Sequence, residues 1–310
     1  MRTAFTEELL ELATQDERVL LLTGDLGFTV LEPFAERFPD RFFNAGVAEQ
    51  NMIGMATGLA EAGLHPFAYS IATFASMRAY EFLRNGAALH ELPVRVVGVG
   101  GGLDYGHNGV THYALEDVGI MRVQPSVTVV APADPAQARA AVWATAELPG
   151  ATYFRIRKAS APVAGLEGRF ELGRAALLGE GEDVAIVALG PMAKEAVEAA
   201  ALLSEEGISA TVAVVSSLNP SPVDDLAELL AGVPLAVSAE AHYVTGGVGS
   251  LTAEVIAEHG LNCRLVRCGV REMPRGDTVA MPTAARSRRR CGEAESDCDE
   301  RASHRVCLKH

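Results

Sequence analysis

The stretch Asn44-Ala-Gly-Val-Ala-Glu-Gln-Asn-Met-Ile-Gly-Met-Ala-Thr-Gly-Leu-Ala60 places one carboxylate, that of Glu49, just ahead of an almost uncharged run. Apolar residues recur there at helical spacing, and Gly54 and Gly58 allow another backbone to approach closely. A helix that is apolar nearly all round is a buried helix, so we expect one that begins at or near Glu49. A buried carboxylate is costly without a specific partner, but an acid at a helix N-terminus can also be an ordinary cap. The residues alone leave both interpretations of Glu49 open.

Composition narrows the class of protein. The 310 residues are enough for one large or two ordinary α/β domains. The net charge of −14 argues against nucleic acid or an anionic membrane as a partner. No apolar run is long enough to span a bilayer, the first residues lack the apolar core of a signal peptide, and the five cysteines include no CxxC pair. We therefore expect a soluble protein of the reduced cytoplasm.

Short apolar runs alternate with helical patterns over residues 1–158. Helices are predicted at 6–13, 75–89 and 135–145, and strands at 19–23, 41–43, 67–71, 94–99, 127–131 and 153–157. This alternation of about six βα units predicts a doubly wound domain with a parallel sheet. The Gly24-Asp25 turn after the first strand and a glycine-rich loop after the fourth stand where such domains place ligands.

The second half repeats the same α/β pattern after a linker rich in Pro, Ala and Gly at 159–172. A smaller α/β domain is expected over 173–275, with strands at 184–189, 210–215, 235–238 and 263–268 and helices at 193–206, 224–230 and up to 258. Residues 276–310 lack apolar periodicity, so we expect a disordered tail, either native sequence or a shifted reading frame after Thr278. A zinc site in this tail, from Cys298, His304, Cys307 and His310, would lack a standard ligand spacing.

Three motifs stand in order along the first domain: Gly24-Asp25-Leu26, Gly46-Val-Ala-Glu49-Gln and Gly109-Val-Thr-His112. With Ala72-Thr-Phe74 and Arg78-Ala-Tyr80, they resemble the pyrimidine-binding domain of transketolase and deoxyxylulose-phosphate synthase. Glu240-Ala-His242 and the following glycines resemble the carboxy-terminal domain of the same family. The resemblance covers about residues 1–275.

The resemblance implies a partner for Glu49. In the family, the matching glutamate hydrogen-bonds a ring nitrogen of thiamine diphosphate, which turns the neighbouring amino group into a base beside the thiazolium C2–H. The resulting carbanion attacks a ketose carbonyl. Asp25 and Leu26 belong to the same cofactor-binding set by resemblance, and Phe74, Met77 and Tyr80 are candidates for the wall of the pyrimidine, or else core residues of one helix.

The resemblance also implies substrate-binding residues. His112 matches a histidine that handles the hydroxyl protons of the substrate, and Asn108 stands where transketolases usually carry an aspartate. Arg2 and Arg157 align with phosphate-binding positions, since arginine suits bidentate recognition of phosphate, and Thr29 could add a hydroxyl. The alternatives are a structural loop histidine, a frayed terminus for Arg2 and a surface charge for Arg157. The donor and acceptor sugars stay open.

The sequence lacks the diphosphate-binding motif Gly-Asp-Gly…Asn, which holds magnesium in full-length enzymes of this class. We therefore expect one subunit of a split transketolase, with the cofactor and its Mg²⁺ bound through a partner chain that carries the diphosphate domain, in a two-plus-two heterotetramer that acts on sugar phosphates. Two other functions stay open: the beta subunit of a 2-oxo-acid dehydrogenase, and a non-catalytic regulatory subunit with the same fold.

Overall fold

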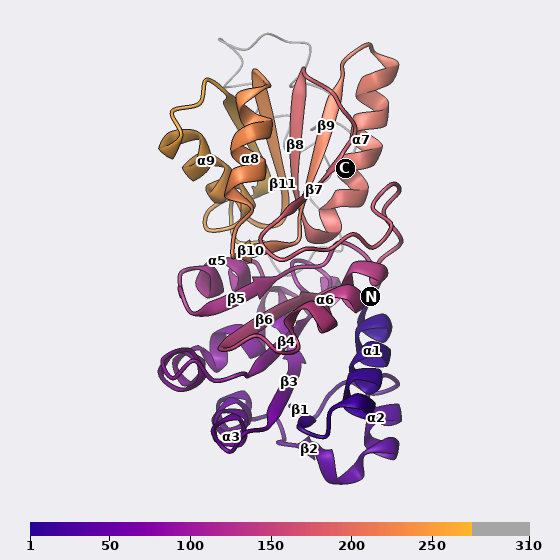
Figure 1. Ribbon diagram of the computed structural model, residues 1–310, viewed down its shortest axis with the longest axis vertical. Helices are drawn as coiled ribbons and strands as arrows, with labels where there is room; N and C mark the ends of the chain where they lie inside the picture. The colour runs from indigo at the N-terminus through magenta and orange to yellow at the C-terminus, as the bar shows by residue number, and fades with distance from the viewer. Residues whose placement is uncertain (275–310) are drawn as a thin grey trace.

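The computed structural model describes residues 1–274, which form two α/β units stacked along the long axis of the molecule (Figure 1). One unit holds a seven-stranded sheet and the other a five-stranded sheet. The predicted fold class, two doubly wound α/β domains, is confirmed. The domain limits at 158 and 173 remain predictions, and the predicted tail and its candidate zinc ligands lie outside the described residues.

The seven-stranded sheet has the order β10-β5-β6-β4-β3-β1-β2. Six of its strands are parallel: β1 (Val19–Thr23), β2 (Phe42–Asn44), β3 (His65–Ile71), β4 (Arg95–Val99), β5 (Val127–Val130) and β6 (Ala151–Ile156). Every residue of β1, β4 and β6 is buried. Strands buried on both faces are rich in apolar residues, which is why these strands could be predicted, although β4 and β6 also bury Arg95 and Arg155.

Strand β1 lies at the point where the strand order reverses. The chain places β2 on one side of β1 and β3 on the other. In open α/β sheets ligands bind outside the carboxyl ends of the strands at such a switch point. The residues that follow β1, β2 and β3 are therefore the first place to look for a site.

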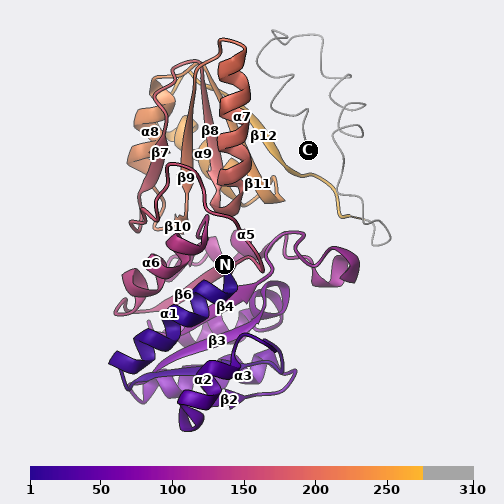
Figure 2. The same cartoon turned by 90° about the vertical axis from the view of Figure 1, so that its right-hand side faces the viewer.

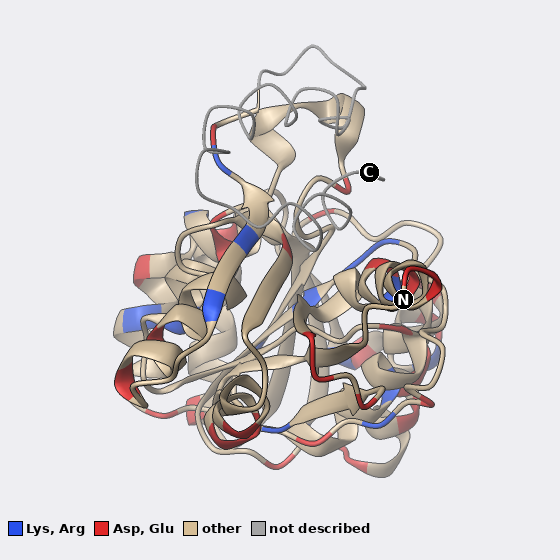
Figure 3. Ribbon diagram, turned by 90° about the horizontal axis from the view of Figure 1, so that it is seen from above, with Lys and Arg blue, Asp and Glu red and all other residues tan. Residues whose placement is uncertain are grey.

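Helices cover both faces of this sheet. One face packs against α1 (Arg2–Gln15), α2 (Glu32–Arg37) and α6 (Pro135–Thr145), and the other against α3 (Glu49–Glu61), α4 (Tyr80–Leu83) and α5 (Asp117–Arg122). On the first face Phe5 of α1 meets Phe154 edge-on, with ring centroids 5.1 Å apart. Seen from above, acidic and basic residues are interspersed over the helices and loops (Figure 3).

Helix α3 begins at Glu49, but the expectation of a helix buried all round is wrong. Met52, Ile53, Ala56 and Ala60 are buried against the sheet. The opposite side is exposed within residues 1–274 and carries Gln50, Asn51, Gly54, Met55 and Gly58. An uncharged, small-residue surface resembles a buried one in sequence, although no described part of this chain covers it.

The predicted helix at 75–89 is interrupted. Two π-helical segments, Phe74–Arg78 and Arg84–Ala88, flank the single turn of α4. Gly86 in the second segment packs on Thr57 of α3, where an added Cβ would come within 2.9 Å of the hydroxyl. Such π segments re-aim side chains and are frequent at functional sites. The first one carries Phe74 and Arg78.

The five-stranded sheet has the order β12-β11-β8-β9-β7. Its strands are β7 (Ala175–Leu178), β8 (Val184–Leu189), β9 (Ala210–Val215), β11 (Leu235–Tyr243) and β12 (Arg264–Val270), and only β7 is antiparallel to its neighbour. Helix α7 (Ala193–Glu205) packs on one face, and α8 (Val223–Ala231) and α9 (Val248–Glu258) pack on the other (Figures 1 and 2).

The two units are connected by strand pairing as well as by packing of side chains. Strand β10 (Ser217–Asn219) follows β9 in the chain but pairs antiparallel with β5 of the first sheet. One apolar cluster also runs from the first sheet and its helices into α8, α9 and β8. The sequence did not predict β10, because three residues carry no strand periodicity.

Candidate active site

The Glu49 carboxylate is buried at the switch point of the first sheet. Only 2% of the residue is exposed. The hydroxyl of Ser70 on β3 donates to Oε1 over 3.0 Å, and Nη1 of Arg78 donates to Oε2 over 3.0 Å. The hydrogen-bond partners of Glu49 are thus side chains of other segments, so the carboxylate is not an ordinary helix cap.

The loops after β1 and β2 are tied together in front of Glu49. Nδ2 of Asn44 donates to the carboxylate of Asp25 over 2.9 Å, and the N–H of Gly46 donates to Oδ1 of Asn44. Asp25 is exposed and adopts a φ of 59°. The Leu26 carbonyl accepts from the Thr23 hydroxyl. At Gly24 an added Cβ would lie 3.4 Å from Oε1 of Glu49, so the first loop passes directly beside the carboxylate.

An aromatic bridge connects Glu49 to His112. The guanidinium carbon of Arg78 lies 3.9 Å from the centroid of the Phe74 ring. Phe74 in turn meets His112 edge-on, with centroids 5.2 Å apart. Oγ1 of Thr111 lies 3.0 Å from Nδ1 of His112, so one ring nitrogen of the histidine is engaged locally. The structure therefore brings together three of the predicted residues, Glu49, Phe74 and His112.

A cluster of charges lies on the far side of His112. Tyr105 is 5.8 Å from His112 between ring centroids, and Nζ of Lys158 lies 3.7 Å above the Tyr105 ring. Burial raises the pKa of the Tyr105 phenol, and the positive charge of Arg2 opposes that rise. Arg2 therefore acts on the same cluster.

Arg157 is already paired in this cluster. Its Nε and Nη2 both lie 2.8 Å from Oδ1 of Asp104, and the backbone N–H of Lys158 donates to the other oxygen. The carboxylate of Asp104 offsets the charge of Arg157. Among the described residues, the ammonium of Lys158 has only its aromatic contact with Tyr105.

No hydrogen bond, ion pair or ring contact within residues 1–274 joins four other predicted residues to Glu49 or His112. Met77 is 43% exposed, and the hydroxyl of Tyr80 accepts from the side chain of Gln124. Asn108 is exposed at the end of a 3-10 turn, and Thr29 is exposed with a φ of 69° and donates its backbone N–H to Glu32. Their roles stay predictions.

Several polar residues of the site were not among the predicted site residues. They are Ser70, Arg78, Asp104, Tyr105 and Lys158. Ser70 could have been noticed as a polar residue at the carboxyl end of an apolar strand. The position of Arg78 beside Glu49 could not have been predicted from the sequence, because it depends on the π-helical turn.

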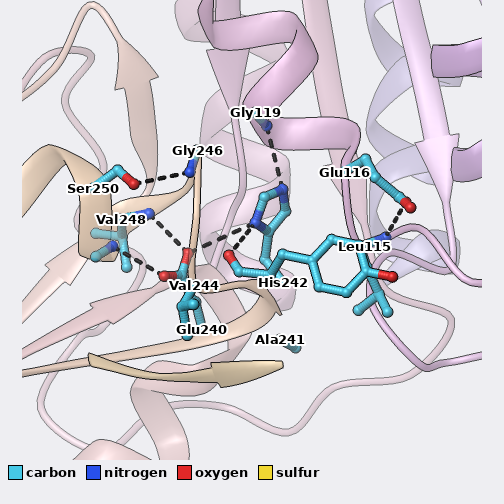
Figure 4. A network of polar contacts seen from close by, with 12 residues as sticks. Leu115, Glu116, Gly119, Glu240, Ala241, His242, Val244, Gly246, Val248 and Ser250 are labelled. Atoms are coloured by element: carbon cyan, nitrogen blue, oxygen red, sulfur yellow. Dashed lines mark hydrogen bonds and ion pairs between the residues drawn. The ribbon is translucent and has the colours of Figure 1, made fainter. Parts of the chain in front are cut away.

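Glu240 and His242 form a second polar network, between the two units (Figure 4). The carboxylate of Glu240 accepts from the N–H groups of Val248 and Gly249 at the start of α9, and burial raises its pKa to about 7. Burial lowers the pKa of His242, whose Nε2 accepts from the Gly119 N–H over 3.3 Å while Nδ1 lies 2.7 Å from the Tyr243 carbonyl. The imidazole is thus neutral near pH 7 and joins α5 to β11.

One cleft of about 510 Å³ borders this network and is lined by both units. Arg122 and Glu254 form an ion pair at its wall. The N–H of Gly246 donates to Oγ of Ser250. These four residues of the cleft wall are thus paired with one another.

One group in residues 1–274 has the ligand types for a metal: Asp16, His65 and Glu147. The guanidinium of Arg18 donates to both carboxylates, over 2.8 Å to Asp16 and 2.7 Å to Glu147. A cation of the protein therefore already occupies this acidic group.

Family comparison agrees with the geometry. The model of the transketolase pyrimidine-binding domain matches residues 1–163, and that of the transketolase C-terminal domain matches residues 173–282. The chain belongs to the transketolase family. The family depends on thiamine diphosphate, and a buried carboxylate beside an aromatic face at a strand switch point fits the pyrimidine end of that cofactor.

Several relatives in the transketolase family match this chain over most of their own length. A putative transketolase C-terminal section of Methanocaldococcus jannaschii is 39% identical over 88% of this chain and 87% of its own length. An apulose-4-phosphate transketolase subunit of Phocaeicola vulgatus is 33% identical, covering 86% of each. A 6-deoxy-6-sulfo-D-fructose transketolase subunit of a Clostridium species is 38% identical, covering 88% and 85%.

Solved structures of the transketolase family share the fold. A split gene transketolase, described as an inactive beta4 tetramer, superposes with a TM-score of 0.82 and 40% identity over 90% of each chain. A transketolase of Pichia stipitis superposes with a TM-score of 0.74 at 21% identity, and the match covers 42% of that longer chain. Two relatives are named as subunits, one as a C-terminal section and one structure as the product of a split gene. This chain is thus similar to partial transketolase chains along nearly its whole length.

Proposed function

We propose that this chain is the pyrimidine-domain subunit of a two-chain transketolase that transfers a two-carbon ketol unit from a ketose to an aldose. The observation that carries the proposal is a continuous series of side-chain contacts. It begins at the buried Glu49 carboxylate and runs through Arg78 and Phe74 to His112. This series of contacts joins the residue that we propose as the cofactor-activating acid to the one that we propose as the substrate-facing histidine.

Glu49, Ser70 and Phe74 would hold the aminopyrimidine of thiamine diphosphate. Ser70 fixes Oε1 of Glu49, and Oε2, which Arg78 contacts in this structure, would accept a hydrogen bond from a protonated ring nitrogen once Arg78 moves away. The ring face of Phe74 suits stacking. When bound, the cofactor supplies a nucleophilic carbon for attack on a ketose carbonyl.

His112 would move the hydroxyl protons of the substrate. Thr111 engages Nδ1 of the imidazole, so Nε2 is the nitrogen available for proton transfer. Asn108 belongs to the same glycine-rich loop. Its side-chain amide would form a hydrogen bond with the donor sugar without adding a charge.

Lys158, with Arg2, would bind the terminal anion of a phosphorylated sugar. Arg157 is offset by Asp104, whereas the ammonium of Lys158 rests on Tyr105 close to His112. A cation on an aromatic platform remains able to turn toward an arriving phosphate. Arg157 and Thr29 would then complete the phosphate environment.

A partner chain would supply the diphosphate-binding domain and its Mg²⁺, because the sequence carries no Gly-Asp-Gly…Asn motif. The exposed side of α3 is its proposed contact. Gly54, Met55 and Gly58 lie there, and an added Cβ at Gly58 would meet nothing within 4 Å. Phe28 and Val47 on the neighbouring loops are 73% and 70% exposed. We propose a two-plus-two heterotetramer in the cytoplasm.

The test is reconstitution. The chain is assayed with xylulose 5-phosphate, an aldose acceptor, Mg²⁺ and thiamine diphosphate, with and without the diphosphate-binding chain. We expect ketol transfer only from the mixture. Turnover by the chain alone would refute the two-chain proposal. Activity with pyruvate in place of the ketose would favour the dehydrogenase alternative, and an unchanged rate with Glu49→Ala would favour the regulatory one.

Within residues 1–274, no helix combines the length and the apolar character that crossing a membrane requires.

A further inference from the structure

Arg78 makes the two contacts that the site would offer to an aminopyrimidine. Its Nη1 donates to Oε2 of Glu49 over 3.0 Å, and its guanidinium lies 3.9 Å over the Phe74 ring. A guanidinium is planar, carries N–H donors and stacks on aromatic faces. It therefore resembles a ring-protonated aminopyrimidine in its planar shape, in the N–H that it presents to Glu49 and in its stacking on Phe74.

The two hydrogen-bond partners of Glu49 differ in how freely their side chains can rotate. Ser70 is fully buried on β3, so its hold on Oε1 is fixed. The side chain of Arg78 is 46% exposed, whereas that of Glu49 is 1% exposed. A long side chain that is half in water can leave the site by rotation, but the hydroxyl of Ser70 cannot.

The carboxylate needs a partner whenever the cofactor is absent. An ionised carboxylate at this depth, with one hydroxyl as its only donor, would carry a large desolvation cost. Arg78 supplies a charge-assisted hydrogen bond to the oxygen that Ser70 leaves free. The π-helical turn at Phe74–Arg78 places Phe74 and Arg78 together at this position.

From these contacts we infer that Arg78 is a displaceable occupant of the pyrimidine subsite. It neutralises Glu49 and covers Phe74 in the cofactor-free chain, and it leaves both when the aminopyrimidine binds. This inference rests on the proposed function, and it adds a positioning residue that opposes cofactor binding while protecting the empty site.

The first experiment uses the full chain alone and measures thermal unfolding. The variants are Arg78→Met, which keeps an apolar stem, Glu49→Gln, and the double variant. We expect Arg78→Met to lower Tm by about 2–6 °C and the loss to shrink strongly when the Glu49→Gln substitution is already present. Arg84→Met is the matched control, because Arg84 lies in the next π-helical segment and donates a hydrogen bond to the neighbouring Asn85, away from Glu49. Equal losses with and without Glu49→Gln would overturn the inference.

The second experiment measures thiamine diphosphate binding by calorimetry in the complex with the diphosphate-binding chain and Mg²⁺. We expect Arg78→Met to lower Kd several-fold, because nothing has to be displaced, and Arg84→Met to leave it unchanged. An unchanged or raised Kd for Arg78→Met would overturn the inference. If the wild-type complex binds no cofactor, the proposed function fails instead, and the unfolding experiment still tests the Arg78–Glu49 pair by itself.

Discussion

Arg155 of β6 donates a hydrogen bond to the carbonyl of Ala241 on β11 over 2.8 Å, and so joins the two α/β units through a buried guanidinium. Its Nε is held at 2.9 Å by the carboxylate of Asp117, which also accepts from the hydroxyl of Tyr153. The Arg155 and Asp117 side chains are 5% and 0% exposed. The contact between the units therefore includes a hydrogen bond from a guanidinium that a desolvated ion pair within the first unit holds in place, as well as an apolar surface.

Arg155→Met is expected to destabilise the chain by about 3 kcal/mol, because it leaves the Asp117 carboxylate buried without its cation. Denaturant unfolding measures the change. Arg139→Met is the matched control, since Arg139 pairs with Glu7 and Glu8 at the surface and is 42% exposed; that loss should stay under about 1 kcal/mol. Similar losses for both variants would contradict the importance of the buried pair.

Glu240 should make stability fall as the pH rises. Burial raises its pKa to about 7, so the folded state binds this proton more tightly than the unfolded state does. The stabilisation is complete below the ordinary glutamate pKa and is lost as the pH rises through about 7. The free energy of unfolding of the wild type, minus that of Glu240→Gln, should therefore decrease between pH 5 and pH 8, by up to about 3 kcal/mol. A flat difference would show that burial does not control this carboxyl.

His242 should make the stability of the chain fall as the pH is lowered. Burial lowers its pKa, so the folded state binds this proton less tightly than the unfolded state does. The contribution of His242 to the free energy of unfolding is present above the ordinary histidine pKa and is lost as the pH falls below that pKa. Comparison of the wild type with His242→Asn over pH 5–8 isolates it, and a difference that grows toward pH 5 in favour of the wild type would contradict this sign.

Glu49→Gln is expected to lower the rate of ketol transfer by at least about 100-fold, because an amide cannot share a proton with the cofactor as a carboxylate can. Steady-state assays of the reconstituted complex give the rate, and circular dichroism checks the fold. Glu61→Gln, at the exposed end of the same helix, should keep full activity. Comparable losses in both variants would point to damage to α3 rather than to chemistry.

Lys158→Met should raise KM for a phosphorylated ketose by about 10-fold or more and leave kcat nearly unchanged, since one charge-assisted contact to phosphate is removed. The same ketose without its phosphate should show no such change. Lys194→Met serves as control, because Lys194 pairs with Glu198 on the surface of α7. An equal rise for both sugars would remove Lys158 from phosphate recognition.

Two substitutions at Gly58 test the stability of the chain and its association with the partner chain separately. Its added Cβ meets nothing within 4 Å, so Gly58→Ala should stabilise the chain by about 0.5–1 kcal/mol through helix propensity. Gly58→Gln should weaken association with the diphosphate-binding chain without destabilising this one. Sedimentation of mixed chains measures association, and unchanged assembly of Gly58→Gln would move the proposed contact away from this side of α3.

The sequence predicted the buried strands well, because β1, β8 and β9 are apolar runs whose limits coincide with their burial. It failed where a neighbouring element decides the conformation. The helix at 75–89 has helical spacing throughout, yet packing of Gly86 on Thr57 accompanies a π-helical turn. The exposed side of α3 was predicted as buried because small apolar residues do not indicate which chain covers them.

The candidate site was predictable only where residues belong to local motifs. Glu49 and His112 stand in such motifs, and the structure places them on either side of Phe74 and Arg78. The pairing of Arg157 with Asp104 was not predictable, because the two residues are 53 positions apart and meet only through the fold. The charge balance around the substrate is therefore a property of tertiary structure.

Strand β10 has a consequence for how such chains can be recombined. Its three residues lie after the first strands of the second unit, yet they close the edge of the first sheet on β5. A chimera that exchanged everything beyond the linker would also replace this edge, and its donor would have to present a matching strand at the same distance along the chain. Exchange at the linker would therefore alter both sheets, whereas exchange of the two units together would leave this edge of the first sheet intact.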